Sequence, residues 1–132
     1  MNICVTGGAG YIGSFIVRQL CSLGHQVTAV DNLSKGHACA VDPRATLVCA
    51  DCGDAAAMLE LLTTRRIEAV VHMAAYSLVG ESVTNPAKYY RNNLMASLSL
   101  IGAMVEAKVP RLVFSSTAAV YGDQDTGPLD LR

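Results

Sequence analysis

The sequence has 132 residues, 52% of them hydrophobic, and a formal net charge of -1 at pH 7. This length suits a single domain with its own hydrophobic core, and no apolar run is long enough to span a membrane. The near-neutral charge gives no electrostatic reason to expect binding to nucleic acid or to an anionic membrane.

Short apolar runs alternate with helical patterns along the chain, which is typical of a parallel sheet covered on both faces. The predicted strands are Asn2–Thr6, Gln26–Asp31, Thr46–Ala50, Ala69–Met73 and Leu112–Ser115. The predicted helices are Tyr11–Leu23, a poorer segment Lys35–Val41, Asp54–Thr64 and Pro86–Ala107. This alternation implies right-handed crossovers and a doubly wound α/β fold, with a ligand above the carboxyl ends of the strands.

Local signals support the helix ends. Gly24 is a candidate C-cap, Gly53 and Asp54 open the third helix, and Asn85 with Pro86 opens the last one. Along the last helix, apolar residues recur at helical spacing and predict a buried stripe of Tyr90, Leu94, Leu98, Ile101 and Val105. Met95 and Met104 lie off this stripe and indicate a second buried face.

A glycine-rich turn joins the first strand to the first helix, with glycines at Gly7, Gly10 and Gly13. Gly7 suits a turn that needs positive φ, Gly10 lets a phosphate reach the backbone, and Gly13 lets the helix pack closely on the strand. The helix start offers N–H groups and a positive dipole end to a pyrophosphate. Because an acidic residue, Asp31, follows at the required spacing, the motif predicts a dinucleotide site; the alternative is a turn that binds nothing.

Two acidic residues end the second and third strands. Asp31 can accept hydrogen bonds from the adenosine ribose and would repel a 2′-phosphate, which favours NAD over NADP. Lys35 could soften that preference, although an exposed lysine is usually only a solvated charge. Asp51 is expected either beside the adenine or as a negative charge near the start of the following helix, and the sequence leaves both open.

Other polar residues stand at strand ends or inside the last helix. His72 is expected to be a strand histidine with a satisfied hydrogen bond, followed by small residues that can lie against a cofactor. Ser115, Ser116 and Thr117 would bring hydroxyl groups to the nicotinamide end. The adjacent asparagines at positions 92 and 93 are poor helix formers, so at least one is expected to have a polar role.

The chain contains five cysteines, Cys4, Cys21, Cys39, Cys49 and Cys52. An odd number argues against a disulfide framework, and an apolar strand directly after Met1 leaves no room for a signal peptide. We therefore expect a cytoplasmic location. The spacing of Cys49 and Cys52 is half of a zinc site, but the second pair is missing, so no metal is expected. Cys4 and Cys49 should pack in strands as small hydrophobic residues.

Several stretches together resemble the UDP-glucose 4-epimerases of the extended short-chain dehydrogenase/reductase group. They are the glycine motif and residues 31–37, 72–82, 89–93 and 114–122. The related 4,6-dehydratases carry an Asp-Glu pair after the threonine, where this chain has Ala118 and Ala119. The resemblance implies a Rossmann fold that binds NAD and acts on a UDP-hexose. NAD takes a hydride from C4 of the sugar, the keto sugar rotates, and the hydride returns to the other face.

The resemblance also implies roles for individual residues. The backbone of Tyr11 and Ile12 would bind the pyrophosphate, and Asp51 with Cys52 would flank the adenine. The adenosine ribose would be held by Asp31, Asn32, Leu33, Ser34, Lys35 and Gly36. The cofactor would be lined by Met73, Ala74, Ala75, Tyr76 and Ser77, with Asn92 contacting it from the long helix. Thr117 would hydrogen-bond the sugar at its reacting carbon.

The family's general base is a tyrosine followed four positions later by a lysine. Within these 132 residues, the positions four after Tyr11, Tyr76, Tyr89, Tyr90 and Tyr121 hold Phe15, Gly80, Asn93, Leu94 and Asp125. In the family the pair follows the fifth strand, as does the substrate-binding part.

We therefore expect residues 1–122 to be an incomplete Rossmann NAD-binding domain, truncated after the fifth strand, and 123–132 to be a loop or tail. The chain alone should bind NAD without turnover, and the parent enzyme is expected to be a homodimer. The alternatives are a regulatory NAD-binding module, one half of a two-chain assembly, an inert product, or another nucleotide-sugar epimerase or dehydratase.

Overall fold

A five-stranded parallel sheet forms the centre of the protein, in the order β3-β2-β1-β4-β5. The computed structural model describes residues 1–117 and 120, so the expected tail 123–132 lies outside the described residues. The strands are β1 (Asn2–Thr6), β2 (Gln26–Asp31), β3 (Thr46–Cys49), β4 (Ala69–His72) and β5 (Leu112–Phe114). This confirms the predicted doubly wound α/β architecture; β3, β4 and β5 each end one residue before their predicted ends.

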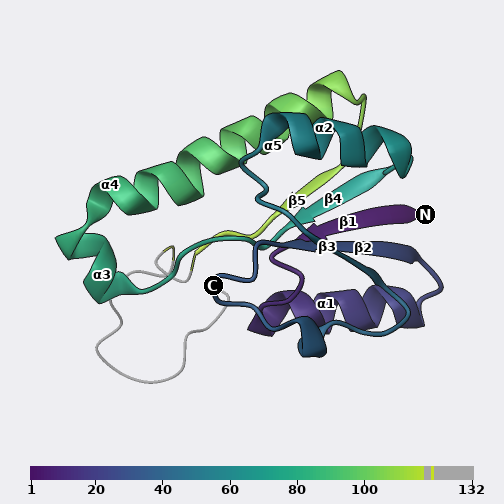
Figure 1. The fold of residues 1–132 in the computed structure, drawn as a ribbon, viewed down its shortest axis with the longest axis horizontal. Coiled ribbons are helices and arrows are strands. Elements are labelled where there is room, and N and C mark those ends of the chain that lie inside the picture. Colours follow the sequence, from purple (N-terminus) through teal and green to yellow (C-terminus); the bar gives the residue numbers. More distant parts are fainter. Residues whose placement is uncertain (118–119, 121–132) are drawn as a thin grey trace.

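Helices cover both faces of the sheet (Figure 1). Helix α1 (Tyr11–Ser22) lies on one face, and α2 (Ala55–Thr64) lies on the other beside α5 (Ala96–Glu106). The predicted N-cap Asp54 is present, because its side chain accepts a hydrogen bond from the N–H of Ala57 at 3.1 Å. The C-cap of α1 is Leu23, and the predicted Gly24 follows it with a φ of 80°.

The long predicted helix is made of three consecutive segments. They are α4 (Pro86–Tyr89), the π-helical segment η2 (Tyr90–Met95) and α5. The Asn85 side chain accepts a hydrogen bond from the N–H of Lys88, so the predicted cap and first-turn proline are correct. The π-helical segment was not predicted, and its wider turns are often found at functional sites.

Two further helical segments differ from the prediction. The segment predicted over Lys35–Val41 is helical only as the 3-10 turn η1 (Ala38–Ala40), which buries no residue. Helix α3 (Val79–Thr84) was not predicted, and it also buries none of its residues. Short helices without a buried face leave no hydrophobic periodicity in the sequence, which is why the sequence failed to indicate their bounds.

The core has two parts, one on each side of the sheet. On the side of α2 and α5, Met58, Leu62 and Leu100 pack against strand residues such as Cys4 and Val70. On the α1 side, the core contains Ile3, Val5, Val17, Cys21, Val27 and Ala29. Successive residues of β1 thus serve opposite faces, as expected for a strand covered on both sides. The exposed Cys49 does not pack in the core as predicted, because it ends β3 at the sheet edge.

The apolar stripe predicted to be buried on the long helix is exposed instead. The exposed fraction is 65% for Tyr90, 59% for Leu98 and 74% for Val105, and Leu94 and Ile101 are exposed as well. The second face predicted from Met104 is the buried one, and it consists of Ala96, Ser97, Leu100, Ala103 and Met104. Leu100, Ala103 and Met104 of this face pack with Met58 and Leu62 of α2 and with Cys4 and Val70 of the sheet. Met95, also predicted to be buried, is exposed.

Among the described residues, no helix has both the length and the apolar character needed to cross a lipid bilayer.

Candidate functional site

A pocket lies at the carboxyl ends of β1 to β4. Its walls are the turn after β1, the loops after β2, β3 and β4, and one residue of η2. The lining residues are Gly7, Gly10, Val30, Asp31, Asn32, Ser34, Lys35, Gly36, Ala50, Asp51, Cys52, Met73, Ala74, Ala75, Tyr76 and Asn92. The chain runs outward from β1 to β2 and β3 in one direction and through β4 to β5 in the other. The pocket therefore sits at the topological switch point, where open α/β sheets bind their ligands.

The glycine turn forms one wall of the pocket and is tightly packed. The N–H of Gly7 donates to the carbonyl of Val30 at 2.8 Å, and the φ of Gly7 is 69°. A Cβ atom on Gly7 would lie 2.8 Å from the backbone nitrogen of Ala74, and one on Gly13 would lie 2.0 Å from the carbonyl oxygen of Gly7. Helix α1 thus starts directly against the strand, which aims its positive N-terminal end at the pocket.

The first turn of α1 is open to a ligand. Its N-cap, Gly10, makes no side-chain cap hydrogen bond, and Tyr11 and Ile12 are exposed there. Backbone N–H groups without a side-chain cap at a helix start form an anion-binding site. The arrangement suits a phosphate, although the side chains of Tyr11 and Ile12 do not line the pocket.

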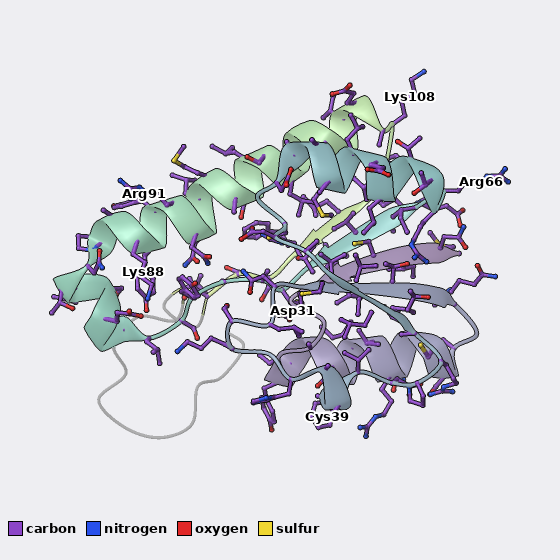
Figure 2. All side chains as sticks on the ribbon, in the orientation of Figure 1. Asp31, Cys39, Arg66, Lys88, Arg91 and Lys108 are labelled. Carbon is purple, nitrogen blue, oxygen red and sulfur yellow. The ribbon has the colours of Figure 1, made fainter. Side chains whose placement is uncertain are left out.

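Asp31 connects the β2 loop to the glycine turn. Its Oδ2 accepts the N–H of Ala9 at 3.0 Å, and its Oδ1 accepts the N–H of Leu33 at 2.9 Å. Leu33 has a φ of 57°, so this short turn is held in a left-handed conformation. Figure 2 shows Asp31 between the sheet and α1. A carboxylate has about four lone-pair sites, so Asp31 retains acceptor capacity for ligand hydroxyl groups.

Asp51 and Asn32 form the neighbouring wall. The Nδ2 of Asn32 donates to the Oδ2 of Asp51 at 3.3 Å, and the N–H of Gly53 donates to the Oδ1 of Asp51 at 2.8 Å. Asp51 lines the pocket, while Asp54 is the residue that caps α2. Burial, then the charge of Asp51, raises the pKa of Cys52 to about 11, so this thiol is neutral and packs as an apolar group.

The wall after β4 is held by an asparagine of η2. The N–H of Tyr76 donates to the Oδ1 of Asn93 at 2.8 Å, and the Nδ2 of Asn93 donates to the carbonyl of Tyr76 at 2.9 Å. The Nδ2 of Asn92 donates to the same Oδ1 at 2.9 Å. Asn92 lines the pocket. Asn93 instead holds the backbone of the wall after β4 through its hydrogen bonds to Tyr76.

Aromatic and charged side chains support Tyr76 from outside the pocket. The rings of Tyr76 and Tyr89 meet edge to face at 5.9 Å, and the ammonium of Lys88 lies 4.8 Å from the Tyr76 ring centroid. Lys88 also forms an ion pair with Glu81, to which the Tyr89 hydroxyl donates at 2.9 Å. In Figure 2, Lys88 points from α4 toward α3, while Arg91 points away on the opposite side. These contacts were not predicted, because α3 buries none of its residues and leaves no periodic pattern in the sequence.

The pocket brings together most of the predicted site residues but not all of them. The exceptions are Tyr11, Ile12, Gly13, Leu33, Ser77 and Thr117. Val30 and Ala50 line the pocket without having been predicted. Val30 directly precedes Asp31, which ends the second predicted strand, and Ala50 directly precedes Asp51, which follows the third. Thr117 lies beyond β5, is exposed, and its carbonyl accepts the N–H of Val120 at 3.2 Å. Within the described part of the chain, no group of three or more His, Cys, Asp or Glu side chains is placed to hold a metal ion.

The fold and the pocket together define a dinucleotide-binding α/β protein. The model of the NAD dependent epimerase/dehydratase family matches residues 3–131, and the chain belongs to that family.

Its similarity to individual proteins points to one branch of the family. The UDP-glucose 4-epimerase of Lactobacillus helveticus is 50% identical over 122 residues, which are 92% of this chain and 37% of that protein. A UDP-glucose 4-epimerase of Klebsiella pneumoniae is 45% identical over 135 residues, covering 97% of each chain.

Several of the similar solved structures hold ligands. The UDP-glucose 4-epimerase of Stenotrophomonas maltophila, with bound NAD and formylated UDP-arabinopyranose, is 44% identical with a TM-score of 0.90. The match covers 97% of this chain and 40% of that one. The chain thus spans less than half the length of most of the relatives it matches.

Proposed function

We propose that this chain binds NAD in the pocket at the carboxyl ends of β1 to β4. The observation that carries the proposal is the fixed position of the Asp31 carboxylate. Its two oxygens accept hydrogen bonds from the backbone N–H groups of Ala9 and Leu33. A carboxylate held in this way presents its remaining lone pairs to a ribose and repels a 2′-phosphate. NAD is therefore expected to bind more tightly than NADP.

The proposed contacts follow the order of the walls. The backbone of Tyr11 and Ile12 binds the pyrophosphate at the start of α1, with Gly7 and Gly10 allowing close approach and Gly13 the packing behind it. The ribose lies on the loop of Asp31, Asn32, Leu33, Ser34, Lys35 and Gly36. Asp51 and Cys52 flank the adenine. The remainder of the cofactor lies along Met73, Ala74, Ala75, Tyr76 and Ser77, and Asn92 contacts it from η2.

The whole protein is proposed to epimerise a UDP-hexose at C4. Bound NAD supplies a reversible hydride acceptor, and the protein orients the sugar and excludes water. Thr117, which follows β5, is proposed to hydrogen-bond the sugar at its reacting carbon. The 132-residue chain contains no tyrosine with a lysine four positions later. Because a tyrosine base needs its pKa lowered by such a neighbour, we propose that this chain holds NAD without turnover.

The proposal also covers the domain limits, the oligomeric state and the cellular location of the protein. Residues 1–122 are proposed as the NAD-binding domain and 123–132 as a tail. The exposed apolar stripe on the long helix supports a homodimer of the whole protein. The five cysteines are all free thiols, which suits a cytoplasmic location.

Isothermal titration calorimetry on the 132-residue chain tests the binding proposal. We expect saturable binding of NAD, competition by ADP-ribose, and weaker binding of NADP. Absence of saturable heat with NAD would overturn it. A coupled assay for conversion of UDP-galactose to UDP-glucose tests the second part, since measurable turnover by this chain would show that the missing pair is not required.

A further inference from the structure

A buried path of hydrogen bonds runs from the sheet to the long helix. The Oγ1 of Thr6, the last residue of β1, lies 2.5 Å from the Nδ1 of His72, the last residue of β4. The Nε2 of His72 lies 2.8 Å from the Oγ of Ser97, on the buried face of α5. All three side chains are buried. Because the path is shielded from water, each of its groups needs its partner within the protein.

Every hydrogen bond of the path is donated in the direction of Asn93. The hydroxyl of Ser97 donates to the carbonyl of Asn93 at 2.5 Å, so its oxygen must accept from His72. The proton of the imidazole is then on Nε2, and Nδ1 accepts from the hydroxyl of Thr6. Burial lowers the pKa of His72, which keeps the ring in this neutral form. Each hydroxyl and the ring therefore have defined donor and acceptor roles.

The path ends at the residue that holds the pocket wall. Ser97 fixes the main-chain carbonyl of Asn93, and the side chain of Asn93 holds both backbone groups of Tyr76. Asn93 lies in the π-helical segment η2, between Asn92, which lines the pocket, and the buried face of α5. The wall itself, from Met73 to Tyr76, has no regular secondary structure and depends on such contacts for its shape.

We propose that His72 is a positioning residue for the cofactor, which acts through Ser97 and Asn93 to fix the backbone at Tyr76. This inference rests on the NAD site proposed above. A wall that is already fixed loses no freedom when a ligand binds, so the network increases affinity by pre-organisation. His72 is not among the residues that line the pocket, so its effect on the cofactor has to pass through other residues.

Two substitutions of His72 each keep one of its two side-chain hydrogen bonds and remove the other. In His72→Gln the side-chain amide can donate to Ser97 from the position of Nε2, but Thr6 loses its acceptor. In His72→Asn the side-chain oxygen can accept from Thr6 near the position of Nδ1, but Ser97 loses its donor. Both variants leave one buried partner unsatisfied, so both are expected to lose stability to a similar extent. They differ in whether the connection to Asn93 survives.

Ser97→Ala breaks the same connection with a smaller change and serves if either histidine variant fails to fold. Ser22→Ala is its matched control. The Ser22 hydroxyl also donates to the carbonyl four residues back, that of Arg18 at 3.0 Å, but Ser22 does not line the pocket.

The first measurement is hydrogen exchange of the Tyr76 amide in the 132-residue chain without ligand. We expect protection in the wild type and Ser22→Ala, most of that protection in His72→Gln, and a loss of about tenfold in His72→Asn and Ser97→Ala. Amides inside β1 and β4 report global stability in the same experiment. Equal Tyr76 protection, relative to those amides, in all variants would overturn the proposal.

The second measurement is NAD affinity by calorimetry. The dissociation constant is expected to rise about tenfold in His72→Asn and Ser97→Ala and clearly less in His72→Gln. Equal weakening in both histidine variants, in proportion to stability, would show a structural role only. If the wild type does not bind NAD, the proposed function fails, while the exchange of Tyr76 still decides whether the network fixes the wall.

Discussion

The carboxylate of Asp31 accepts a hydrogen bond from the backbone N–H of Ala9 at 3.0 Å. This bond joins the end of β2 to the glycine turn after β1, 22 residues apart in sequence. The residue expected to hold a ribose is therefore held by the segment expected to bind the adjoining pyrophosphate. Changes at either position should affect both parts of the site.

Asp31→Asn should weaken NAD binding and reduce the preference for NAD over NADP. The amide can accept from only one of the N–H groups of Ala9 and Leu33, and it turns a donor toward the other. A hydrogen bond to a charged group contributes about 1.5–3 kcal/mol, so the dissociation constant for NAD should rise at least tenfold. Calorimetry with both nucleotides measures this change. The exposed carboxyl of Glu60, outside the pocket, provides the control Glu60→Gln, which should bind like the wild type; an unchanged NAD affinity in Asp31→Asn would contradict the role of Asp31.

Gly13→Ala and Gly102→Ala should change stability in opposite directions. A Cβ on Gly13 would lie 2.0 Å from the carbonyl oxygen of Gly7, so the turn must move, at a cost of about 1–3 kcal/mol or more. Gly102 lies in α5 with nothing within 4 Å of an added Cβ, and alanine there should add about 0.5–1 kcal/mol. Urea unfolding measures both free energies. A stable Gly13→Ala variant with normal NAD affinity would contradict the tight packing of the turn.

The pKa of His72 predicts a loss of stability on mild acidification. Because burial lowers this pKa in the folded protein, the unfolded chain binds the proton more readily. Its contribution is present above the unfolded pKa of about 6.5 and is lost as the pH falls from there toward the lower folded pKa. Urea unfolding of the wild type and His72→Gln from pH 8 to pH 5 tests this. The variant should be less stable at pH 8 and lose less stability on acidification; parallel profiles would exclude His72 as the source.

Glu81 predicts a second loss of stability, at a more acidic pH than the loss expected from His72. Hydrogen bonds from Lys88 and then Tyr89 lower the pKa of this carboxyl. Its contribution is present above the unfolded pKa and is lost as the pH falls through the lower folded pKa. We expect Glu81→Gln to remove a small part of the acid sensitivity below pH 5, because exposed ion pairs contribute little. A change in the profile between pH 8 and pH 6 would contradict this assignment.

The exposed stripe on the long helix should make the 132-residue chain associate. Leu98 and Val105 expose most of their side chains, and contiguous apolar surface favours self-association. Leu98→Glu should shift the chain toward the monomer in light scattering with little change in unfolding free energy. The buried Leu100 lies two positions away, and Leu100→Ala should instead cost about 2–5 kcal/mol. A monodisperse wild-type monomer would contradict the expected association.

Local patterns were sufficient to predict the sheet and, to within one residue, the carboxyl ends of its strands. The apolar runs at β1 and β2 and the spacing from Gly7 to Asp31 depend only on neighbouring residues, so they could be recognised in the sequence. The helical spacing of the long helix indicated two apolar faces but favoured the wrong one as the main buried stripe. Both faces carry leucine side chains, and which of them meets the sheet depends on contacts of Leu100 and Met104 with α2 and the strands, which lie far away in the sequence.

The two asparagines show a different limit. Asn92 and Asn93 are equivalent in sequence, and a regular helix would not decide which one faces the cofactor pocket. The wider turn of η2 and the hydroxyl of Ser97 place Asn93 on the backbone of Tyr76 and leave Asn92 in the lining. Such assignments depend on contacts across 17 residues or more, which no local pattern contains.

The order of the pocket walls along the chain has a consequence for biosynthesis. Within the described part of the chain, every lining residue lies between Gly7 and Asn92, ahead of α5 and β5. A ribosome therefore makes these lining residues before it makes α5 and β5. Because chains fold from the N-terminus during synthesis, the lining residues are present before the Ser97 hydroxyl that holds Asn93, so the wall at Tyr76 reaches its fixed form only once α5 has been made.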